Sequence, residues 1–340
     1  MLSSQMLPRL ACWTHRTLFH SLHFPSSSIS SSRKRFCVNC FNKKMDEHSN
    51  LLARDRKRAN FRLCKLSNYI SEILEIQADK PSLHVLVVPG NPGVILFYED
   101  FVEFLYELLG GTASITAIGQ VSHSRKDLEH GRLFSLQEQI NHKIDFIKEE
   151  LQDIKIPIIL VGHSIGSYIS IEMFKKSLEK VKYCIGLYPF LTLNPHSITQ
   201  SIIGKIAQSQ ILAAALSYLI ASLGLLPVKA LTFIVRKSLG KSWSANAVEA
   251  ACSHLSQLAE TPDWAFLRER KDQCAFLFGD DDHWGPLQLH EEISKQVPGI
   301  PLFIERENHT HGFSCTEAGS LWVAQHVANL IKNQVACANQ

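Results

Sequence analysis

The chain has 340 residues, of which 45% are hydrophobic and 20% are charged, as in an ordinary globular protein. This composition excludes a wholly disordered chain, and the scarcity of long uncharged runs excludes a membrane protein with many spans. The first 45 residues hold seven Lys or Arg and no acid, so the rest of the chain has a formal net charge of −4. A mildly acidic body gives no electrostatic reason to expect nucleic-acid binding.

Residues 1–45 form a basic, Ser-rich leader. This composition is typical of an organellar transit peptide, and a plain disordered tail is the alternative. Met45 begins a stretch of different, charged character and is a candidate alternative start. Cys37 and Cys40 form a CxxC with no second pair nearby, which is weak evidence for a zinc site. The nine cysteines follow no regular framework, which favours a reducing compartment.

Short β-branched apolar runs alternate with helical patterns through most of the remaining chain. Near-continuous apolar runs are typical of strands in a parallel sheet that is covered on both faces. Residues 54–80 carry a weaker signal for early antiparallel strands. The alternation predicts an α/β fold with right-handed crossovers and helices on both faces of the sheet. The predicted strands are residues 83–88, 114–118, 156–161, 183–187, 274–278 and 301–304, and the predicted helices are residues 97–109, 136–151, 165–176, 287–297 and 318–331.

Residues 191–265 interrupt this alternation with a segment of helical character. No charged residue occurs from Ala207 to Val228, but Gly224 and Pro227 break the apolar run, which favours a helical hairpin over a membrane span. We expect the hairpin, residues 200–235, either to cap an active site or to dip into a lipid surface. The predicted organisation is a leader (1–45), a first core part (46–190), a helical cap (191–265) and a second core part (266–340).

Gly162-His163-Ser164-Ile165-Gly166 is a G-x-S-x-G motif. It follows a predicted strand and precedes a predicted helix, which is the context of a nucleophile elbow. The flanking glycines are needed because side chains would collide in so sharp a turn. Ser164 would stand at the apex near a helix N-terminus, where positive potential favours a developing alkoxide. The motif therefore predicts a serine nucleophile.

A serine hydroxyl needs a base, and in this type of fold the partners follow in the order Ser, acid, His. His311 precedes Gly-Phe after the last strand and is the expected base, with His309 as the alternative. The acid should follow the penultimate strand, where Asp282 is favoured and Asp280 is the alternative. The carboxylate would hold the imidazole tautomer and stabilise the imidazolium.

Acyl transfer also requires an oxyanion hole. One expected donor is the backbone N–H of Ile165, directly after the nucleophile. The other is expected in the loop Pro89-Gly90-Asn91-Pro92-Gly93, where the Asn91 amide is the candidate. Cys184 and Cys274 lie in apolar strands and are predicted to be buried.

The P-G-N-P-G loop, the G-H-S-I-G elbow, the Gly-x-x-Asp-x-Trp loop and the final His-Gly-Phe together resemble the lipid droplet-associated hydrolase family of α/β-hydrolases. The resemblance covers roughly residues 80–335. It implies an α/β-hydrolase fold, a triad of Ser164, Asp282 and His311, and residence on lipid droplets or the endoplasmic reticulum. A leader that acts as a transit peptide would instead imply a plastid or mitochondrion.

We therefore expect a serine hydrolase that acts on lipid esters, among them sterol esters or acylglycerols, without a cofactor or metal. Its partners would be the lipid ester and, through the 200–235 hairpin, a lipid surface. Two alternatives remain: an inactive hydrolase scaffold that anchors on lipid droplets, and a small-ester hydrolase or thioesterase. Fold alone does not distinguish them.

Overall fold

A computed structural model describes residues 56–123, 129, 132, 134–194, 200, 258 and 261–338. The leader, the Cys37–Cys40 pair and most of the 191–265 insertion, including the apolar hairpin, lie outside the described residues. Within the described part of the chain, no helix is long and apolar enough to cross a membrane.

The described strands form one mixed sheet of eight strands in the order β1-β2-β4-β3-β5-β6-β7-β8. β1 and β2 are antiparallel to each other, and β2 is antiparallel to β4. All the strands from β3 to β8 run parallel to one another. The expected α/β architecture is confirmed. The strands are β1 (Asn60–Leu66), β2 (Tyr69–Ile76), β3 (Leu83–Val88), β4 (Ala113–Ile118), β5 (Ile158–His163), β6 (Val181–Leu187), β7 (Cys274–Gly279) and β8 (Leu302–Glu305).

The early antiparallel strands, only weakly signalled in the sequence, are a hairpin. Ser67 and Asn68 connect β1 and β2, and both have positive φ, at 48° and 73°. A two-residue turn with positive φ at both positions matches the right-handed twist of the strands it joins. The predicted strand at 156–161 was placed two residues too early. Pro157 has no N–H to donate to the sheet, so β5 begins at Ile158.

The helices occupy nearly the predicted positions, with one difference. The predicted helix 97–109 is divided into a 3₁₀ turn, η2, and a following α-helix, α2. The described helical elements are η2 (Ile95–Tyr98), α2 (Glu99–Leu108), α3 (Leu136–Glu149), α4 (Ile165–Lys176), α9 (Trp264–Glu269), η3 (Lys271–Gln273), α10 (Leu287–Gln296), η4 (Phe313–Cys315) and α11 (Glu317–Ala338).

Helix α3 begins at a capping box. The Ser135 hydroxyl accepts a hydrogen bond from the Glu138 amide, and the Glu138 carboxylate accepts one from the Ser135 amide. These two bonds satisfy backbone donors that have no partner inside a helix. The cap therefore sets where the helix starts.

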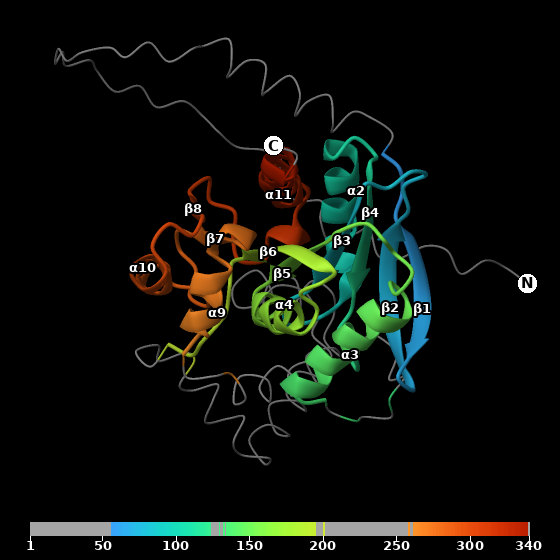
Figure 1. The fold of residues 1–340 in the computed structure, drawn as a ribbon, viewed down its shortest axis with the longest axis horizontal. Helices are drawn as coiled ribbons and strands as arrows, with labels where there is room; N and C mark the ends of the chain where they lie inside the picture. Colours follow the sequence, from blue (N-terminus) through green and yellow to red (C-terminus); the bar gives the residue numbers. More distant parts are fainter. Residues whose placement is uncertain are drawn as a thin grey trace, which may run out of the picture. The chain divides into compact units, whose positions relative to one another are not determined.

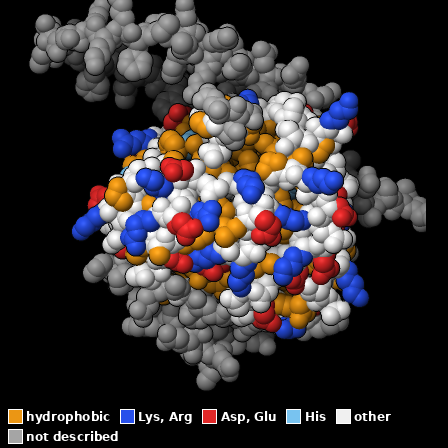
Figure 2. Space-filling model, viewed as in Figure 1, with side chains coloured by type: hydrophobic (Ala, Val, Ile, Leu, Met, Phe, Trp, Pro, Cys, Tyr) orange, Lys and Arg blue, Asp and Glu red, His pale blue; other side chains and the backbone are white. Residues whose placement is uncertain are grey.

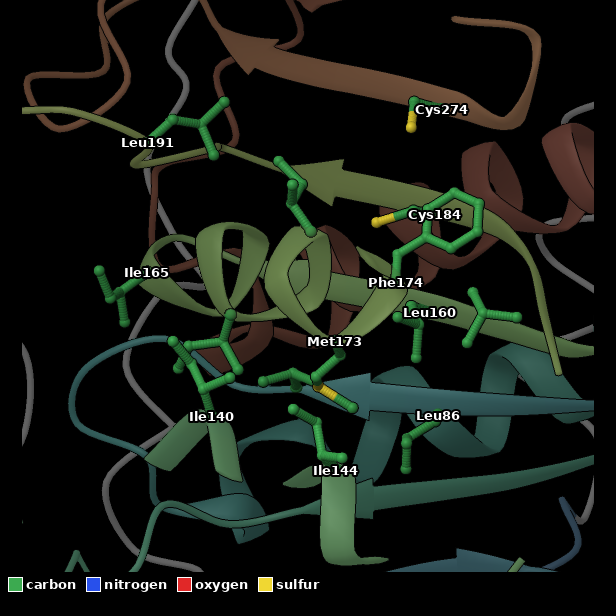
Figure 3. Packing of buried hydrophobic residues seen from close by; sticks show 14 of the residues in the cluster. Leu86, Ile140, Ile144, Leu160, Ile165, Met173, Phe174, Cys184, Leu191 and Cys274 are labelled. Atoms are coloured by element: carbon green, nitrogen blue, oxygen red, sulfur yellow. The ribbon is translucent and has the colours of Figure 1, made fainter. Parts of the chain in front are cut away.

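Helices cover both faces of the sheet (Figure 1). α2 packs against α11 on one face, and α3 packs against α4 on the other. Met173 of α4 lies against Ile140 and Ile144 of α3 and faces Leu86 of β3 (Figure 3), and Met173 itself is fully buried. Burial of apolar side chains on both faces stabilises the sheet that positions the site.

Cys184 and Cys274 are buried, as predicted, with exposed fractions of 1% and 0%. They face each other in the register of β6 and β7, and both are free thiols. Burial raises the pKa of the Cys274 thiol to about 12 and also raises that of Cys184. Both side chains therefore act as small apolar residues of the core.

Candidate active site

The site is assembled from loops that follow parallel strands at their carboxyl ends. The residue after β5 is Ser164, the loop after β7 carries Asp282, and the loop after β8 carries His311. The loop 89–93 follows β3. Ligands of open α/β sheets bind beyond the carboxyl ends of the strands, so this edge is where a site is expected.

Ser164 lies between β5 and α4 with φ 56° and ψ −125°. A non-glycine residue rarely adopts positive φ, and such strain is typically found at functional sites. The Ser164 amide donates to the Leu187 carbonyl at 2.9 Å, and the Ser164 carbonyl accepts from the amides of Ser167 and Phe190. These backbone bonds hold the strained turn in place.

The two glycines of the motif permit the close approach of α4 to the sheet. A Cβ at Gly162 would lie 2.3 Å from the Gly166 carbonyl oxygen, and a Cβ at Gly166 would lie 2.3 Å from the Val88 carbonyl oxygen. Any side chain at either position would collide with backbone. Glycine is therefore required at both positions for the steric reason that the motif suggested.

The structure brings Asp282 and His311 together. His311 Nδ1 lies 2.9 Å from both carboxylate oxygens, and the Asp282 side chain is only 1% exposed. Burial acts to raise the Asp282 pKa, but hydrogen bonds from His311, Trp284 and Gly285 outweigh it, so the pKa lies below its ordinary value. Asp282 is therefore ionised at neutral pH and holds the proton of His311 on Nδ1.

The two alternative residues are placed elsewhere. Asp280 is exposed to solvent. The His309 ring is tilted against Trp322 of α11 at a centroid distance of 5.8 Å, and its amide donates to the buried Glu305 carboxylate. The geometry therefore favours Asp282 and His311 over Asp280 and His309.

The loop 89–93 is close to the elbow. A Cβ at Gly90 would lie 2.8 Å from the Ser164 Cβ, so only glycine fits there. The Gly90 amide donates to the Tyr98 hydroxyl at 3.0 Å, which leaves the next amide, that of Asn91, as the candidate oxyanion donor in this loop. Ile165, the other predicted donor residue, is the first residue of α4.

The loop 89–93 is held at both ends by side chains that the sequence did not single out. Gln120 Nε2 donates to the Pro89 carbonyl at 3.1 Å, and His123 Nδ1 accepts from the Gly93 amide at 3.0 Å. Both residues follow β4, the strand next to β3. Only the pairing of the strands brings them to this loop.

Glu305 is a second contribution that sequence reasoning missed. It ends β8, it is 1% exposed, and its carboxylate accepts hydrogen bonds from the amides of Glu307 and His309. These bonds shape the turn that leads to His311. A carboxylate at the end of the last strand, just before the histidine loop, is the signal that could have found it.

A cavity of about 410 Å³ lies at the acid loop and is lined by Asp282 and other polar residues of that loop together with the apolar Pro286 and Leu287. Gln200, at the start of the insertion, donates to the His283 carbonyl and accepts from the Asn194 amide. The first end of the insertion is thus attached to the loop that carries Asp282.

Among the described residues, no group of three or more His, Cys, Asp or Glu side chains is arranged to hold a metal ion. Acidic and basic side chains are interspersed over the face shown in Figure 2, without a continuous basic surface.

Comparison with known proteins identifies the family of this chain. A family model described as lipid-droplet associated hydrolase matches residues 81–314. A lipid droplet-associated hydrolase from Mus musculus is 26% identical over 271 residues, which are 69% of this chain and 80% of the relative. One from Dictyostelium discoideum is 25% identical over 299 residues, which are 77% of this chain and 94% of the relative.

Among solved structures, a soluble variant of monoglyceride lipase from Saccharomyces cerevisiae has a TM-score of 0.57 at 14% identity. The likeness covers 82% of this chain and 96% of the lipase, and at this identity it shows the fold alone. The family model spans well over half of the chain. The chain has the α/β-hydrolase fold and belongs to the lipid droplet-associated hydrolase family.

Proposed function

We propose that this protein hydrolyses lipid esters through a triad of Ser164, Asp282 and His311. The observations that carry the proposal are the buried Asp282–His311 hydrogen bond and the strained elbow at Ser164, whose neighbour His163 bonds the His311 carbonyl. A carboxylate bonded to Nδ1 leaves Nε2 of the same ring as the base. The names of the family and of its relatives support a lipid substrate.

In the proposed reaction, Ser164 Oγ attacks the ester carbonyl carbon while His311 Nε2 takes the hydroxyl proton. The carbonyl oxygen becomes an oxyanion that accepts hydrogen bonds from the amides of Ile165 and Asn91. The tetrahedral intermediate then collapses, and the alcohol leaves with the proton from His311. Water attacks the acyl-enzyme by the same route and releases the fatty acid. Asp282 stays ionised and stabilises the imidazolium.

The location of the protein is part of the proposal. We infer residence on lipid droplets, because the family and the relatives are named for that association. Attachment would use the 200–235 hairpin, and the endoplasmic reticulum surface is the second expected location.

Deleting residues 200–235 should abolish binding to triacylglycerol emulsions, and unchanged binding would exclude the hairpin as the anchor. Microscopy of the protein tagged at its C-terminus would show lipid droplets, or an organelle if the leader directs it there.

The decisive experiment on activity is covalent labelling with a fluorophosphonate. The wild type should be labelled at Ser164, and the label should be absent in Ser164→Ala. Emulsified cholesteryl ester, triacylglycerol and a soluble thioester should then be compared as substrates. Preference for the soluble thioester would favour the thioesterase alternative, and a folded wild type without labelling would favour an inactive scaffold.

A further inference from the structure

His163, the second residue of the elbow motif, has both ring nitrogens in hydrogen bonds. Nδ1 lies 2.6 Å from the Tyr98 hydroxyl oxygen, and Nε2 lies 2.9 Å from the backbone carbonyl oxygen of His311. The residue itself is 6% exposed. Both polar nitrogens of this buried ring are therefore satisfied, each by a different segment of the site.

The chemistry of the partners sets the direction of each bond. A carbonyl oxygen can only accept, so His163 Nε2 carries the hydrogen and donates it. Burial, and then the nearby His311, lower the His163 pKa to about 3, so the ring is neutral and its Nδ1 holds a lone pair. Nδ1 therefore accepts from the Tyr98 hydroxyl, and that hydroxyl oxygen accepts from the Gly90 amide.

The result is a one-way series of bonds, here called the His163 relay. It runs from the Gly90 N–H to Tyr98 O–H, from Tyr98 to His163 Nδ1, and from His163 Nε2–H to the His311 carbonyl. Each bond polarises the next, so such series are stronger together than singly. The relay joins the loop after β3 to the loop after β8, across the strand end that carries Ser164.

Aromatic packing holds the relay in place. The Phe313 ring lies edge-on to both Tyr98 and His163, with centroid distances of 6.4 and 5.0 Å. Phe313 also stacks on Tyr188 at a centroid distance of 5.7 Å, and Tyr188 itself lies edge-on to His163 at 6.2 Å. Phe313 and Tyr188 are 1% and 0% exposed, so water is kept from the bonds.

We infer that His163 and Tyr98 are positioning residues, which set the distance between the oxyanion loop and the base. This inference rests on the proposed ester hydrolysis. The relay turns the Gly90 amide toward Tyr98, so the following amide of Asn91 is the one presented to the oxyanion. At its other end it fixes the His311 backbone, whose ring must reach both Asp282 and Ser164. An apolar residue at position 163 could fill the space but could do neither.

The kinetic test uses four single variants. His163→Leu removes both bonds of the ring, Tyr98→Phe removes the hydroxyl, and His163→Gln keeps one donor and one acceptor. Tyr183→Phe, a change of the same kind at a buried tyrosine of β6, is the matched control. We expect kcat to fall 10- to 100-fold in His163→Leu and Tyr98→Phe with KM within twofold, since misplacement by about 1 Å costs up to about 10². The Gln variant should recover most of the loss.

The double variant His163→Leu/Tyr98→Phe should be no worse than the poorer single variant, because the two residues act in one relay. Fluorophosphonate labelling should slow by the same factor as kcat, while still reaching one label per folded chain. If His163→Leu or the control variant does not fold, as judged by circular dichroism, Tyr98→Phe and His163→Gln carry the test. Undiminished kcat in Tyr98→Phe would overturn the inference.

A measurement without substrate separates this inference from the proposed function. ¹⁵N chemical shifts of the wild-type histidines should show His163 as the neutral Nε2–H tautomer at pH 5 as well as pH 8. The Gly90 amide should be protected from hydrogen exchange, and protection should be lost in Tyr98→Phe. An Nδ1–H tautomer would overturn the relay even in an active enzyme. A correct tautomer in a wild type without turnover would overturn the proposed function, and with it the catalytic consequence of the relay.

Discussion

Two buried polar regions contact or neighbour the oxyanion loop. They differ in whether the ionisable group at their centre has a partner that can carry the opposite charge. In the triad region, the Asp282 carboxylate is paired with His311 through bonds of 2.9 Å. In the second region, called the Lys143 region after its central residue, Lys143 is 0% exposed and donates only to the Gly119 carbonyl and to Gln139 Oε1, both at 3.0 Å. No carboxylate pairs with Lys143 among the described residues.

Each region also contains a neutral buried histidine. His163 of the triad region and His142 of the Lys143 region both have a pKa lowered by burial to about 3, with a further contribution from a neighbouring His311 or Lys143. The two rings differ in their partners: His163 uses both nitrogens, whereas His142 bonds only the Ser71 hydroxyl, through Nε2. Both nitrogens of His163 therefore have a defined hydrogen-bond partner, whereas only Nε2 of His142 has one.

The difference fits the role proposed for each region. In the proposed reaction the triad region carries a proton, and its Asp282 carboxylate is stabilised by the hydrogen-bonded His311 ring. The Lys143 region only holds a loop: Lys143 binds Gly119, Gln139 binds Val121, and the same loop places Gln120 against Pro89. Hydrogen bonds to neutral acceptors hold this loop, and burial lowers the pKa of Lys143. The Lys143 region thus holds the loop after β4, which in turn holds the oxyanion loop through Gln120.

The largest expected effect comes from breaking the charge of the triad region. Asp282→Asn should lower kcat by about 10⁴-fold, because an amide cannot stabilise the imidazolium and favours the wrong tautomer of His311. Ester turnover measures this. Asp280→Asn is the matched control, since Asp280 is exposed, and it should leave kcat within twofold. Equal losses in the two variants would mean that the buried pair has no special role.

Acid should destabilise both regions together. A histidine whose folded pKa is lowered binds its proton more readily in the unfolded chain, so stability is lost as pH falls below the unfolded value of about 6.5. From pH 7 to 5, His163 and His142 together should lower the free energy of unfolding by about 4 kcal/mol. His84 and His326, with pKa values lowered by burial to about 4, act in the same direction.

Urea unfolding at pH 7, 6 and 5 checks this expectation. The window lies above the ordinary pKa values of Asp and Glu, so the carboxylates contribute little to it. His142→Gln should reduce the slope of stability with pH, and Gln in place of the exposed His283 should leave the slope unchanged. A stability independent of pH across this window would contradict the neutral buried state of these rings.

Loosening the support of the oxyanion loop should have a moderate effect. Gln120→Leu removes the bond to the Pro89 carbonyl, and we expect about a 10-fold fall in kcat, less than the 10² or more lost with an oxyanion donor itself. Gln137→Leu on the exposed face of α3 is the matched control. A fall in the control of the same size would attribute the loss to general destabilisation.

The last prediction concerns Lys143. Its pKa is lowered well below the ordinary lysine value by burial, so the unfolded chain binds a proton that the folded chain lacks in the window just below pH 10.5. Stability should therefore rise with pH in that window by about 1.4 kcal/mol per unit from this group. Lys143→Met should remove the rise, whereas the exposed Lys148→Met should keep it. Urea unfolding between pH 8 and 10 measures both, and an unchanged slope in Lys143→Met would show a charged Lys143.

Local sequence determined the strands, the helices and the chemical types at the site. Apolar runs and helical spacing located β3 to β8 and the main helices because both signals arise from neighbours along the chain. The need for Gly162 was readable for the same reason, since a side chain there would collide with Gly166 in the same turn, whereas a side chain at Gly166 would collide with Val88 of β3, which only the folded sheet brings close. The family motifs also favoured Asp282 and His311, which the structure places in one hydrogen bond.

The tertiary structure alone decided which polar groups meet across the loops. Tyr98 lies 65 residues from His163, and His163 lies 148 residues from the His311 carbonyl that it binds. Gln120 and His123 reach the oxyanion loop only because β4 pairs with β3. A single sequence carries no trace of a hydrogen bond between distant segments, because its direction depends on burial, tautomer and strand order, and these exist only once the chain has folded.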